Sequence, residues 1–273
     1  MRGILDRVSH AQTTVEALEP IRSEPARSAI LLDIDGTLAP IVRHAADARV
    51  PESTRTLLIE VSRRYGVVAC VSGRRASIAR QIVAIGTIAY VGSHGGELLR
   101  PGATAAEVDP ALREWTGRMQ DFAARAHTVE RERLRVRFED KGSIVAYHWR
   151  GAPDEEAAEA AVREIAAEAQ GEGMIAHWGR KVLEVRPPVE FDKGIGVTRL
   201  LRGGPARAAV YVGDDTTDLD GFRGLRELVS DGTLARALCV AVGSDEAPEE
   251  LTGQADMTVE GPDGVRALLE ALL

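Results

Sequence analysis

Two aspartates directly after an apolar run are the first residues whose types and spacing suggest chemistry. Asp33 and Asp35 flank Ile34 and are followed by Gly36 and Thr37. Side chains two positions apart point to the same side of a strand, and two like charges buried inside a strand are costly. At the carboxyl end of a parallel strand, where ligands bind, the same pair of carboxylates becomes useful.

We expect Asp33 to hold a phosphoryl group together with a divalent cation, while Asp35 handles protons. Gly36 lets the chain turn tightly and bring backbone N–H groups close to phosphate oxygens, and we place Thr37 in the same binding loop. An Asp-Gly turn after a strand, without any catalytic role, is the alternative for this motif taken alone.

A second acidic motif follows another apolar run. Residues 213–218 supply carboxylates at Asp214, Asp215 and Asp218. Mg²⁺ prefers hard oxygen ligands and usually takes one or two carboxylates beside water and phosphate. We expect Asp214 to bind the metal directly and Asp215 to belong to the metal site, with Asp215 and Asp218 acting as supporting groups or through water. An acidic helix N-terminus is the alternative, which fits Asp218 well but fits Gly-Asp-Asp at the end of an apolar run poorly.

Two further motifs could bind an anion. Ser72, Gly73 and Arg74 follow an apolar run, where a hydroxyl and free N–H groups at a helix start would form a phosphate site. Lys193, between Asp192 and Gly194, could neutralise both the phosphate and Asp33. Taken alone, Ser72 is better explained as an ordinary helix N-cap, and a single lysine is usually a solvated surface charge.

The elements that must carry these motifs are short, nearly continuous apolar runs, as is typical of strands buried on both faces. Helix-like segments alternate with them, and this alternation predicts an α/β fold with a Rossmann-like, doubly wound parallel sheet. We expect strands at 29–35, 66–73, 88–95, 208–215 and 237–243. We expect helices at 52–64, 74–85, 193–201 and 217–228.

The middle of the chain has a different pattern. Helix-like segments at 111–126 and 154–170 are each followed by an alternating segment, 134–150 and 173–187, that reads as a pair of strands. We therefore expect an α+β cap domain at 103–187, inserted into a core domain formed by 1–102 and 188–273. The role of residues 1–27 stays open.

Composition excludes several classes of function. The 273 residues carry a net charge of −8, which argues against non-specific nucleic-acid binding, because that binding relies on a dense basic surface. We expect no disulfide framework from Cys70 and Cys239, no membrane partner, a cytoplasmic location and a monomer. The histidines at 44, 127, 148 and 177 show no metal-ligand spacing.

The order of the four motifs resembles the haloacid dehalogenase-like phosphohydrolases. Seven stretches are similar to trehalose-6-phosphate phosphatases in particular, a family with an α+β cap at the place predicted here. At Ile34, Gly96 and Trp149 the chain departs from residues that are common in that family. The similar stretches are 31–42, 71–74, 92–98, 138–150, 179–187, 192–194 and 212–218.

The resemblance implies a Mg²⁺-dependent phosphatase acting on a small sugar phosphate. It implies that Asp33 attacks phosphorus and forms an aspartyl-phosphate, and that Asp35 protonates the leaving sugar oxygen and then activates water. Ser72 and Lys193 would hold the phosphoryl group. Mg²⁺ would be bound by the Asp33 carboxylate, the Asp35 backbone carbonyl and Asp214. Further substrate contacts are expected at Gly36, Thr37, Gly73 and Arg74.

The cap is expected to recognise the sugar. By the resemblance, Glu139, Lys141, Lys181 and Glu184 would hydrogen-bond hydroxyl groups of a disaccharide, and polar sites of this kind discriminate strongly between ligands. The pattern alone allows an equally good reading of these residues as cross-strand ion pairs on an exposed sheet face. Glu97 and Arg150 are lesser candidates, and His94 is expected to have a structural role in its loop.

Two alternatives to the function stay open. Related capped phosphatases act on sucrose-6-phosphate or mannosyl-3-phosphoglycerate, which would keep the chemistry and change the substrate. Asp33 could instead be the phospho-acceptor of a regulatory module without turnover, although the presence of Asp35 and of a cap argues against this.

Overall fold

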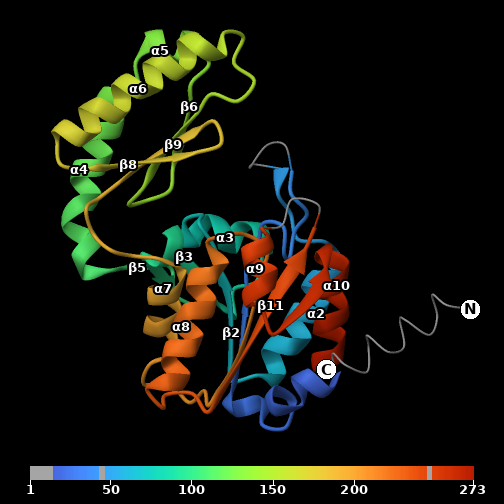
Figure 1. Ribbon diagram of the computed structural model, residues 1–273. Helices are drawn as coiled ribbons and strands as arrows, with labels where there is room; N and C mark the ends of the chain where they lie inside the picture. Colours follow the sequence, from blue (N-terminus) through green and yellow to red (C-terminus); the bar gives the residue numbers. More distant parts are fainter. Residues whose placement is uncertain (1–14, 43–46, 245–247) are drawn as a thin grey trace, which may run out of the picture. The chain divides into compact units, whose positions relative to one another are not determined.

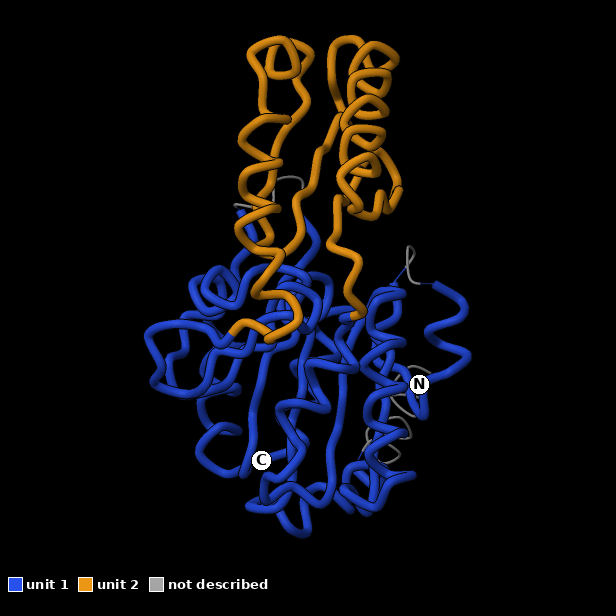
Figure 2. Tube along the Cα trace, turned by 90° about the vertical axis from the view of Figure 1, so that its left-hand side faces the viewer, with its two compact units in different colours: residues 1–107, 191–273 blue, residues 108–190 orange. Residues whose placement is uncertain are grey.

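The computed structural model describes residues 15–42, 47–244 and 248–273. His44 and residues 1–14 therefore lie outside the described residues, whereas residues 15–27 lie within them. The chain divides into two compact units, one formed by residues 1–107 and 191–273 and the other by residues 108–190 (Figure 2). We expected the inserted segment at 103–187; the unit begins later because the chain adds one more short strand to the large sheet before it leaves the first unit.

The first unit is built on an eight-stranded sheet in the order β12-β11-β10-β1-β2-β3-β4-β5 (Figure 1). Neighbouring strands from β12 to β3 are parallel, and β4 is antiparallel to β3. The expected doubly wound α/β fold is confirmed. The strands are β1 Ser28–Leu32, β2 Val67–Val71, β3 Ala89–Gly92, β4 Glu97–Leu99, β5 Glu107–Val108, β10 Ala208–Gly213, β11 Arg236–Gly243 and β12 Met257–Glu260.

Helices cover both faces of this sheet. On one face α2 (Glu52–Arg64), α3 (Ala76–Val83) and α10 (Gly261–Leu272) pack against alternate strand residues in one apolar cluster. On the other face α7 (Lys193–Leu201), α8 (Asp218–Ser230) and α9 (Glu249–Gln254) enclose a second cluster. Because helices cover both faces of the sheet, β1 has no exposed residue. Strands in this position are therefore mainly apolar.

The second unit has a four-stranded antiparallel sheet in the order β6-β7-β9-β8. One face of the sheet, with Tyr147 and Leu183 at its centre, packs against helices in a separate apolar cluster. The other face carries the row Glu139, Ala146, Glu184 and His177, which are directly opposed across the four strands. The elements are α4 Pro110–Ala126, α5 Val129–Arg133, β6 Arg137–Asp140, β7 Val145–His148, α6 Glu155–Gly171, β8 Ile175–Gly179 and β9 Val182–Arg186.

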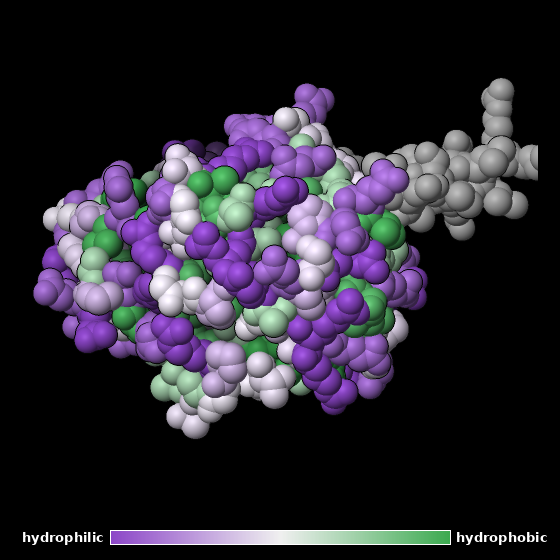
Figure 3. All heavy atoms as spheres, turned by 90° about the horizontal axis from the view of Figure 1, so that it is seen from below, coloured by the Kyte–Doolittle hydropathy of each residue, from purple (hydrophilic) through white to green (hydrophobic). Residues whose placement is uncertain are grey.

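The surface of the protein is mixed in polarity. On the face drawn in Figure 3, apolar side chains lie as small patches among hydrophilic ones, as is usual for a folded domain. Among the described residues, the helices fall short of the length and apolarity that a membrane crossing requires. Cys70 and Cys239 are buried and free, in line with the expectation that no disulfide framework exists.

Candidate active site

The site begins where two neighbouring strands end. Strands β1 and β10 are adjacent and parallel although they lie far apart in the sequence, with Leu32 paired to Val212. Asp33 continues the pairing, because its N–H donates to the Val212 carbonyl at 2.9 Å. Asp214 follows the last residue of β10, so the sheet itself brings Asp33 and Asp214 to the same carboxyl edge, as the sequence predicts.

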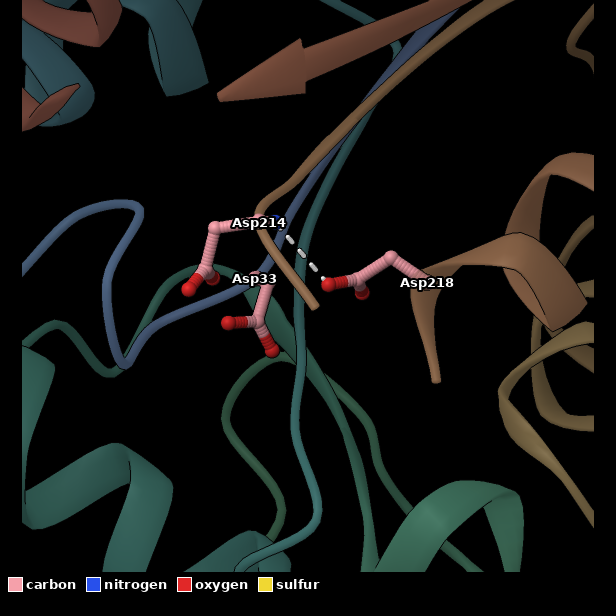
Figure 4. Close-up of side chains that lie close together, drawn as sticks. All are labelled: Asp33, Asp214 and Asp218. Atoms are coloured by element: carbon pink, nitrogen blue, oxygen red, sulfur yellow. Dashed lines mark hydrogen bonds between the residues drawn. The ribbon is translucent and has the colours of Figure 1, made fainter. Parts of the chain in front are cut away.

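Three carboxylates converge at this edge. The side chains of Asp33, Asp214 and Asp218 lie close together (Figure 4), and each offers an oxygen within 4.8 Å of the others. Lys193, at the first position of α7, joins the group: its Nζ lies 2.8 Å from Asp33 Oδ1 and 2.7 Å from Asp218 Oδ1. The expectation that Lys193 neutralises Asp33 therefore agrees with the geometry, and this lysine is buried rather than solvated.

This group contains more negatively charged than positively charged side chains. Burial raises the pKa of Asp33 well above its ordinary value; Lys193 opposes that rise, and the charges of Asp218 and Asp214 add to it. Burial and the charge of Asp218 raise the pKa of Asp214 to about 7. Burial alone would lower the pKa of Lys193, but the charges of Asp218 and Asp33 raise it, so the lysine stays cationic. One cation faces three carboxylates, and the donor set fits a further, divalent cation.

Asp218 organises the site. Its Oδ1 accepts from Lys193 and from the Tyr211 hydroxyl, each at 2.7 Å. Its Oδ2 accepts from the backbone N–H groups of Asp214 and Asp215, each at 3.0 Å. A carboxylate offers about four lone-pair positions, so these donors occupy Asp218 fully. We infer that Asp218 fixes its neighbours and that Asp33 and Asp214 hold the open metal positions.

Asp215, which the sequence reading assigns to the metal site, points elsewhere. It is exposed, and its Oδ1 accepts from the backbone N–H and the hydroxyl of Thr216. The structure brings Asp218 into the carboxylate cluster in its place. A single sequence does not separate the two, because the local turn decides which carboxylate faces the strand ends.

The loop after Asp33 shapes the metal side of the site. Gly36 adopts φ +88°, and a Cβ at this position would lie 2.0 Å from Asp214 Oδ2, so only glycine fits. The N–H of Gly36 donates to the Ala39 carbonyl, and is therefore engaged within the turn. Thr37 is fully buried, and its hydroxyl donates to Asp214 Oδ1 at 3.1 Å. In this structure both residues support Asp214, and their expected contact with phosphate stays a prediction.

Asp35 is held by Arg74. The guanidinium donates from Nε and Nη2 to the two carboxylate oxygens of Asp35, both at 2.7 Å, in a fork-to-fork pair. The Asp35 side chain keeps 36% of its surface exposed, whereas Arg74 keeps 15%. Arg74 is therefore a partner of the proposed proton-transfer group, and its expected contact with substrate stays a prediction.

Ser72 lies beside this pair but does not cap a helix. It is buried, and its hydroxyl accepts from the Arg74 N–H at 3.2 Å. Helix α3 begins later, and its first N–H, that of Ala76, is capped by the buried carboxylate of Glu97 at 2.8 Å. Glu97 thus has a structural partner that the sequence reading missed, since the capping group comes from another strand.

Gly73 and His94 form a close contact next to Ser72. A Cβ at Gly73 would lie 2.5 Å from Nε2 of the His94 ring. His94 adopts φ +52° and its N–H donates to the Ser72 carbonyl at 3.2 Å. The structural loop role expected for His94 fits these contacts.

The residues proposed to read a sugar lie in the second unit. Glu139 and Glu184 share one face of the sheet. Lys141 Nζ lies 2.8 Å from Glu184 Oε1, and Arg186 contacts Oε2 of the same glutamate. Glu139 Oε2 lies 2.9 Å from Nε2 of His148. In this structure these side chains pair with one another across the strands.

Lys181 is separate from that row. It occupies the turn between β8 and β9 with φ +60° and lies 2.5 Å from Glu155 at the start of α6. The structure thus pairs Lys141 with Glu184, places Glu139 on the same sheet face with His148 as a partner, and places Lys181 at a different position of the same unit.

Comparisons with known proteins extend these observations. A family model described as trehalose-phosphatase matches residues 31–255. The chain is 32% identical over 247 residues to a trehalose-phosphate phosphatase of Mycobacterium marinum, covering 84% of this chain and 61% of that protein. The chain therefore spans less than two thirds of the length of this relative.

Solved structures share the fold. The C-terminal domain of Candida albicans trehalose-6-phosphate phosphatase superposes with a TM-score of 0.71 at 22% identity, covering 96% of each chain. A haloacid dehalogenase-like hydrolase from Bacteroides thetaiotaomicron superposes with a TM-score of 0.60 at 16% identity, covering 90% of this chain and 99% of that one. With the family match spanning both units and every motif of the carboxylate site, the chain belongs to the trehalose-phosphatase family.

Proposed function

We propose that the protein hydrolyses trehalose 6-phosphate to trehalose and phosphate. The observation that carries the proposal is the buried contact of Lys193 with Asp33 at 2.8 Å, at a sheet edge where Asp214 directly follows strand β10. A cationic group beside a carboxylate at a buried, polar strand edge is the arrangement that phosphoryl transfer needs. Family membership supports the choice of substrate.

In the first step, an Asp33 oxygen attacks phosphorus and the bond from phosphorus to the sugar oxygen breaks. Asp35 gives a proton to the departing sugar oxygen, leaving an aspartyl-phosphate on Asp33. Lys193 and Ser72 hold the phosphoryl oxygens during the transfer. Because both Asp35 oxygens accept from Arg74, one of them must leave the guanidinium when Asp35 carries the proton.

In the second step, Asp35 takes a proton from water as the water oxygen attacks phosphorus. The bond between phosphorus and Asp33 breaks, phosphate leaves, and Asp33 and Asp35 return to their starting roles. Splitting the displacement in two lets the same carboxylate serve first as acid and then as base.

The site fits Mg²⁺, which would be held by the Asp33 and Asp214 carboxylates and the Asp35 backbone carbonyl. The bound ion would neutralise phosphoryl charge and favour the ionised, nucleophilic form of Asp33. Thr37 and Gly36 keep Asp214 in place for this role. Asp215 stays a candidate for contact through water.

Stabilisation by Mg²⁺ is expected to grow as the pH rises. The pKa of Asp214 is raised to about 7, so the metal-free folded protein binds an extra proton that the unfolded chain does not. Its contribution to stability is complete below the ordinary Asp pKa and is lost as the pH rises through about 7. Mg²⁺ binds the ionised form and must displace that proton at lower pH.

Thermal unfolding with Mg²⁺ or EDTA at pH 5.5 and pH 8 measures this effect. We expect a larger increase in Tm from Mg²⁺ at pH 8, and an Asp214→Asn variant that responds at neither pH. An equal increase at both pH values would contradict the raised pKa of Asp214, and a full response to Mg²⁺ in Asp214→Asn would contradict a metal site at this residue.

A substrate panel tests the proposed function. The values of kcat/KM for trehalose 6-phosphate, sucrose-6-phosphate and mannosyl-3-phosphoglycerate are compared with and without Mg²⁺. We expect the highest value for trehalose 6-phosphate, and only with Mg²⁺. Preference for either other sugar phosphate would overturn the substrate assignment, and a single turnover without further phosphate release would favour the regulatory phospho-acceptor.

Composition adds an argument for the cap residues. The chain has 34 lysines and arginines, of which only Lys141, Lys181 and Lys193 are lysines. In a chain that otherwise uses arginine throughout, lysine remains at the three positions proposed to contact substrate. A compact ammonium and a planar guanidinium are not interchangeable at a site of defined geometry. We therefore interpret Lys141 and Lys181 as functional residues rather than as members of ordinary surface ion pairs.

Loss of a cap residue should affect the sugar alone. We expect Glu139→Ala and Lys181→Ala to raise KM for the sugar phosphate about tenfold or more, because a hydroxyl loses its charged partner. The kinetics of 4-nitrophenyl phosphate should change little. Glu159→Ala, which removes an exposed ion pair on α6, is the matched control, and equal losses on both substrates would count against recognition by the cap.

A monomeric state and a cytoplasmic location stay predictions. Light scattering of the purified protein and fractionation of the source cells test them directly.

A further inference from the structure

The buried hydroxyl of Tyr211 is a polar group in direct contact with the carboxylate cluster, and the proposed mechanism does not use it. Tyr211 lies in β10, is fully buried, and donates to Asp218 Oδ1 at 2.7 Å. The same oxygen accepts from Lys193 at 2.7 Å, and Lys193 continues to Asp33 at 2.8 Å. A continuous hydrogen-bonded chain therefore runs from Tyr211 through Asp218 and Lys193 to the proposed nucleophile.

The ring of Tyr211 is fixed by its surroundings. It packs edge-on against Phe222, with ring centroids 5.8 Å apart. A Cβ at Gly221 would lie 2.4 Å from the ring, so α8 passes directly over it. At Gly224, one turn further along α8, a Cβ would lie 2.7 Å from the backbone of Gly194. Glycines thus allow α8 to approach both Tyr211 and the start of α7, which carries Lys193.

Other buried tyrosines use their hydroxyl groups differently. Tyr90 donates to the Ile85 carbonyl at 2.5 Å, and Tyr65 donates to the Leu272 carbonyl at 2.9 Å. Both are ordinary ways to satisfy a buried hydroxyl with backbone. Tyr211 instead donates to a carboxylate that contacts a proposed catalytic group, which points to a role beyond packing.

We propose that Tyr211 is a positioning residue of the phosphoryl-transfer site, which acts through Asp218 to hold Lys193 against Asp33. The hydroxyl fills the remaining acceptor position of Asp218 Oδ1. Without it, that buried position is unsatisfied and Lys193 is the remaining donor to Oδ1, so the place of Lys193 is less firmly fixed. The proposal rests on the proposed function only in requiring phosphoryl transfer at Asp33, and it does not depend on which sugar is the substrate.

Tyr211→Phe keeps the ring and removes the hydroxyl, and Tyr90→Phe makes the same change at a buried site away from the cluster. With 4-nitrophenyl phosphate and with trehalose 6-phosphate, we expect Tyr211→Phe to lower kcat about tenfold with KM within about twofold. Tyr90→Phe should lower Tm but leave kcat within about twofold. If Tyr211→Phe kept wild-type kcat, or if both variants lost kcat equally, the proposal would fail.

A second measurement does not depend on turnover. Because the chain has three lysines, ¹⁵N-lysine labelling gives a simple spectrum, in which a buried, hydrogen-bonded ammonium exchanges slowly enough to be seen; Lys193→Arg assigns its signal. We expect Tyr211→Phe to shift or broaden the Lys193 signal and Tyr90→Phe to leave it in place. An unchanged signal in Tyr211→Phe would overturn the proposal even if the protein proved inactive on every phosphate ester.

A double variant guards against a simple folding defect. If Tyr211 acts through Asp218, Tyr211→Phe should cost little further kcat once Asp218→Asn is present. Additive losses in the double variant would show that Tyr211 acts by another route. Wild-type failure on trehalose 6-phosphate with activity on 4-nitrophenyl phosphate would reject the proposed substrate and leave the Tyr211 proposal standing.

Discussion

Replacement of Asp33 by asparagine is expected to lower kcat by roughly 10⁴-fold or more, since an amide cannot form the aspartyl-phosphate. The fold should be kept, and the stability should not fall. Burial already raises the pKa of Asp33 well above its ordinary value, which means that the folded protein holds this negative charge at a cost. A neutral asparagine of the same shape removes that cost and leaves Lys193 its contact with Asp218.

Phosphate release from the sugar phosphate and from 4-nitrophenyl phosphate measures the loss, and calorimetry measures Tm. Asp231→Asn is the matched control, because Asp231 is exposed at the end of α8 and pairs only with Arg202 and its own turn. Incubation with ³²P-labelled substrate and acid quenching should label the wild-type protein and not Asp33→Asn. Turnover retained in Asp33→Asn would show that another residue is the nucleophile.

Most of the fold is predictable because the central strands β1, β2, β3 and β10 are almost entirely buried. Runs such as that of β1, in which one serine is followed only by alanine, isoleucine and leucine, have few other stable environments. Strand β12 and helix α10, at the end of the chain, were not predicted from an apolar run. The residues of β12 alternate in exposure, and β12 leads directly into α10, so the periodic signal is too short to separate strand from helix.

The site is predictable to the extent that strand ends determine it. Asp33 and Asp214 meet because β1 and β10 are neighbours, and a sequence reading can reach that result from strand alternation. The pairings of Asp35 with Arg74 and of Glu97 with Ala76 join segments through side-chain geometry alone. No local pattern encodes such contacts, so the sequence proposes Arg74 as a site residue without identifying its partner.

One signal in the sequence was available and informative. The near absence of lysine makes Lys141, Lys181 and Lys193 stand out without any structure. The choice between Asp215 and Asp218 had no such marker, because both lie in one short turn, and only the backbone path shows that Oδ2 of Asp218 accepts from the N–H groups of Asp214 and Asp215.

Replacement of Lys193 by methionine is expected to remove activity and to destabilise the first unit strongly. Lys193 forms ion pairs with both Asp33 and Asp218, and its side chain is 4% exposed. Removing one partner of a buried ion pair leaves an uncompensated charge and costs about 3–5 kcal/mol. For a unit of this size, that corresponds to a decrease in Tm on the order of 10 °C.

The loss of stability in Lys193→Met should depend on pH, and its direction follows from the pKa of Asp33. Lys193 opposes the rise in the pKa of Asp33, so that pKa rises further in the variant. The folded variant then binds a proton that the unfolded chain has released, and its stability falls as the pH rises toward the folded pKa. We therefore expect the difference in Tm between wild type and Lys193→Met to be larger at pH 8 than at pH 4.5.

Lys181→Met is the matched control, because it removes an exposed ion pair, whereas Lys193→Met removes buried ion pairs. Lys181 is 44% exposed and pairs with an exposed glutamate, and such pairs contribute little to stability. Its Tm should stay close to that of the wild type at both pH values. The charge of Lys193 would not hold the buried cluster together if Lys193→Met lost no more stability than Lys181→Met, or if it lost stability equally at both pH values. A buried cation should make the stability depend on its own presence and also on the ionisation of the aspartates around it.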